Sequence, residues 1–192
     1  MISRKGSNRC FAKGYWPRMP KSIIMPLQKN VRRSTSSWIG RLALIISATS
    51  GLMIIAKSNI CHNELSKIDI EKYYLCLVHG HLQESEMLIE KNIKREDPPS
   101  ILRYIDKDGQ IAKTIVKEIK RYEDKSLVEA KLITGRCHQI RLHLASIGNP
   151  IVGDKLYGKA EDERLCLHAY HLKFIHPFTS NVIDIYDYPD FE

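Results

Sequence analysis

The first third of the chain has no acidic side chain. Residues 1–63 contain eleven Lys or Arg and no Asp or Glu, and Glu64 is the first carboxylate. The remaining residues carry nineteen basic and twenty-two acidic side chains, so the net charge of +8 comes from the N-terminal third. Such a cationic segment attracts phosphate backbones or acidic membrane surfaces by nonspecific Coulomb forces. The alternative interpretation is an exposed, disordered basic tail.

Cysteine is scarce, and its pattern excludes a disulfide framework. The five cysteines are an odd number and include no CxxC pair, which indicates a reducing compartment. Cys166, His168 and His171 are closely spaced, but on a strand the first two would face one side and the third the other. We therefore expect no metal site there, and we assign these side chains to packing and hydrogen bonding.

No apolar run is long enough for a clear membrane span. The run at residues 42–56 has fifteen residues with Ser, Thr and Gly in its middle, whereas a spanning helix needs about 20 apolar residues. The forty-one residues before it are too many for the start of a signal peptide. We expect this run to enter a core.

Residues 1–40 have no sustained helical or strand period, and we interpret them as irregular. Their acid-free composition with Arg and Ser also fits an organelle transit peptide, but no amphipathic stripe supports that interpretation. We expect a cytoplasmic protein.

Internal repeats are also absent, and beyond Gly51 short β-rich runs alternate with turn signals. The clearest helix is predicted at about 136–148, where Gly148-Asn149-Pro150 ends it, and residues 59–67 fit one or two helical turns. This pattern predicts an α+β fold with a mixed, largely antiparallel sheet and few helices. The strand-like runs are residues 52–57, 72–80, 87–93, 110–122, 127–133, 166–174 and 181–186.

The predicted helix has basic side chains at its start. A Gly135-Arg136 turn leads into it from a strand, and His138, Gln139 and Arg141 follow. Free backbone N–H groups and the positive end of the helix dipole lie at the same place, which predicts a site for phosphate or carboxylate.

The helical period divides these residues between two faces. Ile140, Leu144 and Ile147 share one face and should pack on the sheet, whereas His138 and Arg141 fall roughly opposite. The alternative to an anion site is a polar outer face that makes routine salt bridges.

The stretch TGRCHQIRLHLASIGNPIVGDKLYG, residues 134–158, resembles the signature block of the RluA-type pseudouridine synthases, especially the RluC-like enzymes of large-subunit rRNA. Further stretches match other motifs of that family in the same order, and together they cover about residues 49–192. They are TSGLMIIAKS (49–58), KYYLCLVHG (72–80), GQIAKT (109–114) and RLCLHAYHLKFIHP (164–177).

The resemblance implies the pseudouridine synthase catalytic fold and an enzyme that isomerises RNA uridines, with rRNA as the expected partner. It implies no metal and no organic cofactor, and we expect a monomer. By position in the motifs, Tyr74 would stack on a flipped base and Arg141 would pair with the catalytic carboxylate. Residues implied to line the pocket or to contact RNA are Lys72, Arg136, His138, Gln139 and His143.

The catalytic nucleophile of that family is missing here. It is an Asp in a His-Arg-Leu-Asp-x-x-Thr-Ser-Gly stretch, and this chain keeps only the final Thr-Ser-Gly at 49–51. Counting back without gaps places the Asp position on Ile46, and anchoring on the Arg-Leu pair at 41–42 places it on Ala43. Asp154 and Glu64 are acids that would have to substitute, and nothing in the sequence favours either one.

We therefore expect an irregular basic segment without family resemblance at residues 1–48 and a partial catalytic domain at residues 49–192. A frame change or gene remnant upstream of residue 49 would account for the loss, and the other two reading frames of the DNA test that hypothesis. Two functions remain open: an RNA-uridine isomerase, impaired as written, and a noncatalytic RNA-binding remnant of such an enzyme.

Overall fold

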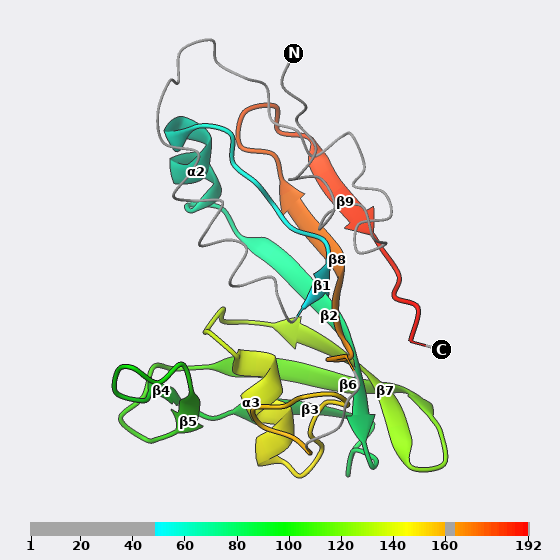
Figure 1. Ribbon diagram of the computed structural model, residues 1–192. Coiled ribbons are helices and arrows are strands. Elements are labelled where there is room, and N and C mark those ends of the chain that lie inside the picture. The colour runs from blue at the N-terminus through cyan, green and yellow to red at the C-terminus, as the bar shows by residue number, and fades with distance from the viewer. Residues whose placement is uncertain (1–48, 160–163, 192) are drawn as a thin grey trace, which may run out of the picture.

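The computed structural model describes residues 49–159 and 164–191 (Figure 1). The predictions for residues 1–48, including both possible positions of the missing Asp, lie outside the described residues.

A seven-stranded mixed sheet organises the described part of the chain. Its order is β1-β8-β2-β7-β6-β3, and β9 also pairs with β8. β1 is parallel to β8, and the other neighbours are antiparallel. The strands are β1 (Ser50–Gly51), β2 (Ile70–His79), β3 (Glu86–Glu90), β6 (Lys113–Arg121), β7 (Lys125–Leu132), β8 (Leu167–Ile175) and β9 (Val182–Tyr186). The expected α+β class with a largely antiparallel sheet is confirmed.

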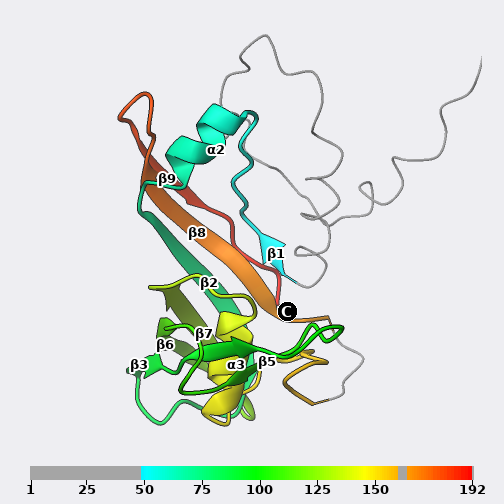
Figure 2. The same ribbon diagram turned by 90° about the vertical axis from the view of Figure 1, so that its left-hand side faces the viewer.

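A second, two-stranded sheet lies beside the end of the main one. β4 (Ile93–Arg95) and β5 (Arg103–Ile105) pair as an antiparallel hairpin. Figure 1 shows this hairpin next to helix α3, and Figure 2 shows that α3 and the hairpin lie together at one end of the sheet. The sequence analysis missed β5, because a three-residue strand has too short an alternation to detect.

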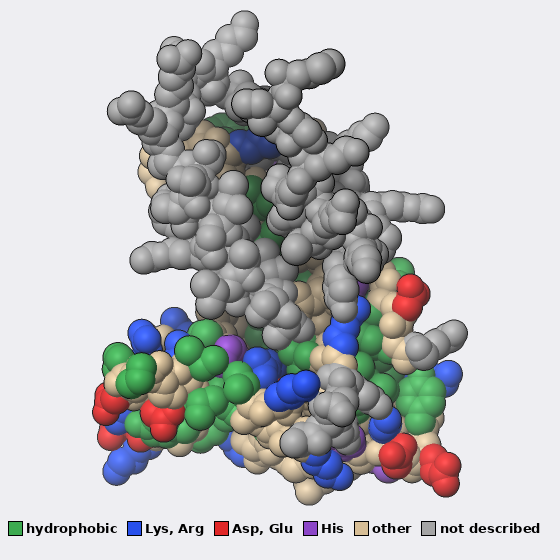
Figure 3. All heavy atoms as spheres, in the orientation of Figure 1, with side chains coloured by type: hydrophobic (Ala, Val, Ile, Leu, Met, Phe, Trp, Pro, Cys, Tyr) green, Lys and Arg blue, Asp and Glu red, His purple; other side chains and the backbone are tan. Residues whose placement is uncertain are grey.

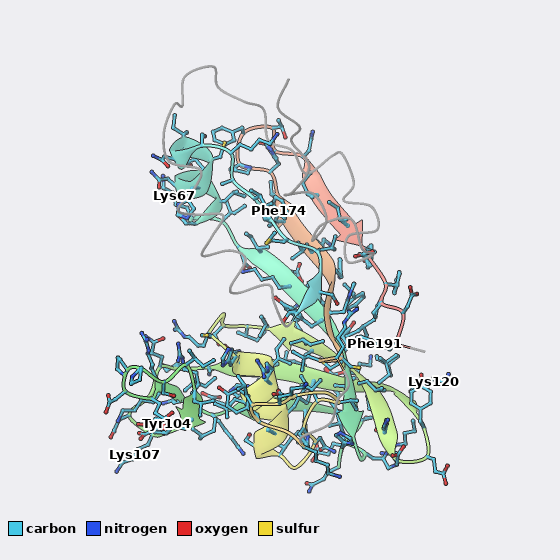
Figure 4. The ribbon with its side chains drawn as sticks, in the orientation of Figure 1. Lys67, Tyr104, Lys107, Lys120, Phe174 and Phe191 are labelled. Carbon is cyan, nitrogen blue, oxygen red and sulfur yellow. The ribbon has the colours of Figure 1, made fainter. Side chains whose placement is uncertain are left out.

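Two helices pack on one face of the main sheet. α2 (Asn59–Leu65) begins where the Ser58 hydroxyl accepts a hydrogen bond from the amide of Cys61, as an N-cap does. Its buried side chains, Cys61 and Leu65, contact Phe174 of β8 in a small core at the far end of the sheet (Figure 4).

α3 (Gln139–Ser146) covers the other end of that face. Ile140 and Leu144 enter the main core with Cys76 of β2 and Ala130 of β7, as the helical period predicts. The helix is shorter than the predicted 136–148, because residue 138 has a left-handed backbone and helical geometry starts only after it.

The interpretation of α3 as a helix with a polar outer face is wrong. Six consecutive residues, Gln139 to Leu144, are buried. A helix buried around most of its circumference must satisfy its polar side chains inside the protein.

The predicted strand at 52–57 is also wrong, because only Ser50–Gly51 pairs with β8. Gly51 has a φ of 101° and lies so close to β8 that a Cβ there would be 2.3 Å from the carbonyl oxygen of Ala169. Ile54 and Ala56 nevertheless pack against the core under α2. No helix within residues 49–159 and 164–191 is long and apolar enough to cross a membrane.

Candidate active site at the start of helix α3

The turn from β7 into α3 is closed by the side chain of Gln139. Its Oε1 accepts hydrogen bonds from the amide of Arg136 and from the hydroxyl of Thr134, both at 2.9 Å. His138, the N-cap residue, has a φ of 58° and makes no side-chain cap. The turn therefore owes its shape to a buried glutamine, and the Arg136 side chain remains on the surface.

Gln139 also binds the helix to strand β6. Its Nε2 donates to the carbonyl of Lys113 and to the hydroxyl of Thr114, both at 2.9 Å. Each polar group of this buried amide thus has a partner within the chain, which is the condition for burying it without a large penalty.

His143, with no exposed surface, makes the next connection. Its Nδ1 lies 2.9 Å from the Thr114 hydroxyl and its Nε2 lies 3.0 Å from the carbonyl of Lys91. Because a carbonyl only accepts, Nε2 carries the proton and Nδ1 accepts from Thr114. Burial lowers the pKa of His143, so the ring is neutral in this environment.

The structure therefore places Gln139 and His143 inside the protein, with their hydrogen bonds directed to β6 and to the residue after β3. The sequence analysis grouped both with the residues that line the pocket or contact RNA. In the fold they position the helix that carries Arg141.

Arg141 forms a buried ion pair with Asp154. Its Nε donates to Oδ2 at 2.7 Å and its Nη2 donates to Oδ1, in a two-pronged contact. Arg141 is 8% exposed and Asp154 is 0% exposed. Burial by itself raises the pKa of Asp154, but the hydrogen bonds from Arg141 and from two backbone amides outweigh burial and lower it.

Asp154 accepts four hydrogen bonds in all. Besides Arg141, its Oδ1 accepts from the amides of Leu156 and Tyr157 at 2.9 and 3.0 Å. Glu64, the other acid considered as a substitute nucleophile, lies on α2 and pairs with Lys67 at 2.7 Å. α2 packs at the opposite end of the sheet from α3, so Glu64 lies away from Arg141 (Figure 1). Asp154 lies beside Arg141, but its carboxylate is bonded to that guanidinium.

Tyr157 joins this ion pair to the helix start and to the hairpin. Its ring centroid is 5.2 Å from the guanidinium carbon of Arg141, and its hydroxyl lies 2.8 Å from Nδ1 of His138. The same hydroxyl accepts a hydrogen bond from the amide of Arg103 in β5 at 2.9 Å. Burial, followed by the charge of Arg141, lowers the pKa of His138.

Tyr74 and Lys72 lie on β2, on the sheet face that α3 and α2 cover. Tyr74 is partly buried against the main core, and burial raises the pKa of its hydroxyl. Tyr74 pairs with Ala130 of β7 and Ala169 of β8, two residues with small side chains. Lys72 is half-buried two residues earlier.

The tail of the catalytic motif is attached to the C-terminal part of the chain. The hydroxyl of Ser50 lies 2.9 Å from Nδ1 of His168, and Nε2 of His168 lies 3.0 Å from the carbonyl of Asp187. Arg164 donates to the Ser50 hydroxyl at 2.7 Å. The sequence showed these polar residues, but their partners are more than a hundred positions away from Ser50, so spacing could not reveal the connection.

The histidines and cysteine once considered for a metal have other contacts. His168 bonds as described, and Nε2 of His171 lies 2.8 Å from Asp184. Among the residues that the structure describes, no group of three or more His, Cys, Asp or Glu is arranged to hold a metal ion.

Comparison with known proteins agrees with the motifs. Residues 27–146 match the RNA pseudouridylate synthase family, and this range begins upstream of residue 49, where the recognised motifs start. The uncharacterized RNA pseudouridine synthase YjbO of Bacillus subtilis is 38% identical over 137 residues, which are 68% of this chain and 48% of the relative.

Two further relatives have more specific names. The dual-specificity RNA pseudouridine synthase RluA of Pasteurella multocida is 38% identical over 69% of this chain and 65% of its own length. The ribosomal large subunit pseudouridine synthase C of Vibrio cholerae is 30% identical over 72% of this chain and 48% of its own length. The chain spans about half the length of most of the curated relatives it matches.

Solved structures show the same fold. Human RNA Pseudouridylate Synthase Domain Containing 1 has a TM-score of 0.59 at 27% identity, covering 68% of this chain and 58% of the human chain. Human RNA Pseudouridylate Synthase Domain Containing 4 has a TM-score of 0.61 over 74% of this chain and 68% of its own, and at 19% identity it shows the fold alone. Because the family match covers more than half of its residues, this chain belongs to the RNA pseudouridylate synthase family.

Proposed function

We propose that this chain acts on RNA, and that the start of α3 is the remaining part of a site that isomerises a uridine of large-subunit rRNA to pseudouridine. The observation that carries the proposal is Arg141: a guanidinium inside the protein, held from two sides, at the position where the family motif puts the partner of the catalytic carboxylate.

The reaction needs a base that has left the helical stack. The bond from the ribose C1′ to N1 breaks, the uracil turns, and a bond from C1′ to C5 forms. The C5 hydrogen leaves as a proton and N1 gains one, so the formula of the nucleotide is unchanged. Enzymes that perform chemistry on a base inside RNA extrude that base into a pocket.

The described residues divide into two groups for this work. Tyr74 would stack on the extruded base, an interaction worth about 1–3 kcal/mol that tolerates any base. Arg136, His138 and Lys72 would contact the RNA, since they keep exposed or half-exposed positions. Gln139 and His143 would hold the helix in place.

Arg141 still has donor capacity for a carboxylate. A guanidinium has five N–H groups. The Asp154 contact uses Nε and Nη2, so Nη1 is not engaged by that carboxylate. Asp154 thus balances the charge of Arg141 within the chain and also fixes the plane in which its other donors lie.

The proposed function can be tested by restoring the missing carboxylate and measuring isomerisation. Removal of a covalent nucleophile costs on the order of 10⁶ in rate, so the chain as written should release tritium from [5-³H]uridine-labelled rRNA very slowly. The variants Ile46→Asp and Ala43→Asp each restore a carboxylate at one of the two positions implied by the motif. One of them should release tritium in a quantity equal to the pseudouridine formed, and adding Arg141→Met to it should abolish release.

The other outcomes are also informative. If folded, RNA-binding protein releases no tritium with either restored Asp, the chain is a noncatalytic RNA-binding remnant, and the proposal fails. If the chain as written already converts uridine rapidly, isomerisation is supported and another nucleophile must exist. A monomer in the cytoplasm is part of the proposal, and size-exclusion chromatography and cell fractionation test it.

A further inference from the structure

We propose that Tyr157 is a positioning residue whose hydroxyl holds the His138 ring in the tautomer with its proton on Nε2 and attaches the β4–β5 hairpin to the start of α3. The part of this proposal that concerns RNA depends on the proposed function, whereas the tautomer does not.

The hydrogen bonds of the Tyr157 hydroxyl favour one tautomer of His138. A phenol has one O–H to donate, and its oxygen accepts. The amide of Arg103 lies 2.9 Å away and must donate to that oxygen, and we assign the single O–H to Nδ1 of His138 at 2.8 Å. In a neutral imidazole one nitrogen accepts and the other carries the proton. Nε2 of His138 is therefore an N–H donor.

The charges around His138 favour the neutral ring. Arg141 on α3 and Arg103 on β5 oppose protonation, and Asp154 in the following loop favours it. Asp154 is already paired with Arg141 at hydrogen-bonding distance, so its charge is largely neutralised locally. Burial acts in the same direction as the two arginines and lowers the pKa of His138.

Tyr157 also connects three parts of the chain. Its amide donates to Asp154, its ring lies against Arg141, and its hydroxyl accepts from β5. Tyr157 also packs beside the small core of Ile93, Ala112 and Leu142, which lies under the hairpin. The phenol is thus a direct link between the hairpin and the arginine.

The hairpin presents charged side chains of both signs beside the start of α3. Lys94, Arg95 and Arg103 lie on its strands, Lys107 follows β5, and the side chain of Tyr104 is exposed. The same stretch also carries Glu96, Asp97, Asp106 and Asp108, and Lys94 pairs with Asp106 at 3.6 Å. Figure 4 shows Tyr104 and Lys107 pointing away from the body of the protein, and Figure 3 shows basic, acidic and apolar side chains together in this region. A hairpin attached through Tyr157 would keep this surface in a constant position relative to His138.

The two donors have a chemical consequence. A neutral N–H on His138 and a guanidinium on Arg141 both recognise acceptor oxygens, such as those of a phosphate or of a uracil carbonyl. Because the neutral histidine ring already has an N–H to donate and need not become cationic, its contribution to RNA binding should not require acidic pH.

Nuclear magnetic resonance of the histidine rings tests the tautomer without RNA. Two-bond ¹H–¹⁵N spectra of the full chain should show His138 with its proton on Nε2. If the proton is on Nδ1 in the unmodified chain, the proposal is overturned without any variant.

The variant Tyr157→Phe keeps the ring over Arg141 and removes only the hydroxyl. The bond donated to Nδ1 stabilises the neutral ring, so its loss should raise the pKa of His138 and allow both tautomers. The signals of His143, which is bonded to Thr114 and Lys91, serve as the matched control and should not move. If the tautomer and the titration of His138 are the same in both proteins, Tyr157 does not position it.

A binding measurement extends the test to RNA. Fluorescence anisotropy with a uridine-containing single-stranded oligoribonucleotide should show Tyr157→Phe binding about 2- to 10-fold more weakly, the effect of one lost hydrogen bond. A changed tautomer with unchanged affinity would overturn the coupling to RNA. If neither protein binds RNA, the proposed function fails while the spectra still decide the tautomer.

Discussion

Two polar regions of this protein differ in where their hydrogen bonds can go. The α3 network consists of Thr114, Gln139, Arg141, His143 and Asp154, all of them buried and none more than 8% exposed. The open face, on the opposite side of the sheet, consists of Glu71, Tyr73, Lys131, Asp184 and Tyr186.

The open face is as well connected as the α3 network. Tyr73 donates to Glu71 at 2.7 Å, and Lys131 donates to Glu71 at 3.0 Å and lies over the Tyr73 ring. The rings of Tyr73 and Tyr186 stack on either side of His171, with centroids 4.8 and 4.0 Å from it. Yet Glu71 and Lys131 are 37% and 34% exposed at their side chains, so water replaces any partner that is lost.

The comparison shows that the number of hydrogen-bond partners in a region does not measure how much that region contributes to the free energy of unfolding. In the α3 network a lost partner leaves a buried group without a hydrogen bond, and that cost is far larger than the net gain of one bond. On the open face, loss of a partner should change the free energy of unfolding very little, because water takes its place. The predictions below test this difference.

The largest effect is expected from Asp154→Asn. The substitution keeps a similar shape but leaves the buried guanidinium of Arg141 without a counter-charge, and breaking one side of such a pair costs about 3–5 kcal/mol. Urea denaturation followed by circular dichroism measures the loss. Glu71→Gln, the matched change on the open face, should cost far less than Asp154→Asn, because water screens this exposed ion pair. Equal losses for the two variants would refute the comparison.

A smaller effect is expected from acid. Burial lowers the pKa of His138, His143 and His168 below the ordinary value of 6.5. Each stays neutral in the folded protein while the unfolded chain takes up a proton, so stability is complete above pH 6.5 and falls as pH decreases below it. Each such histidine contributes a slope of at most about 1.4 kcal/mol per pH unit.

Urea midpoints at several pH values measure this slope. His143→Gln removes one buried titrating ring and should make the slope shallower, whereas Gln83→Ala, at an exposed position, should not. An unchanged slope in the His143 variant would mean that its ring does not stay neutral in the fold.

The smallest effect is expected from Lys131→Met. The change removes the half-exposed ion pair with Glu71 and the contact over Tyr73, but its methylene groups can still cover the ring. We expect a change within about 1 kcal/mol in the same denaturation experiment. A loss above 2 kcal/mol would show that the open face carries stability as the α3 network does.

Much of the architecture could be predicted from the sequence, for a simple reason. β2 is rich in β-branched and aromatic residues, and β7 alternates buried and more exposed residues, and both are local patterns that can be read without knowledge of neighbours. α2 was predicted from a short run, and its cap at Ser58 is also local. What failed was the strand at 52–57, where apolar composition suggested pairing that occurs only at Ser50–Gly51.

The candidate site was only partly predictable. The positions of Arg136, His138 and Arg141 at a helix start follow from spacing and motif. The structural role of Gln139 and His143 does not follow from spacing. Their hydrogen-bond partners Lys113, Thr114 and Lys91 are distant in sequence and are brought close by the β3–β6 pairing. Polar residues on a helix look alike in sequence whether they face water or a strand.

The sequence by itself determined most of the order of strands and helices along the chain, the basic start of α3 and the lack of a carboxylate before Glu64, since these depend on residues near one another or on composition. Only the tertiary structure decided that Arg141 pairs with Asp154, that Tyr157 links them to His138 and the hairpin, and that two implied RNA contacts lie inside the protein. The physical reason is that a hydrogen bond forms between groups that are close in space. Folding brings together donors and acceptors whose separation along the sequence gives no sign of that contact.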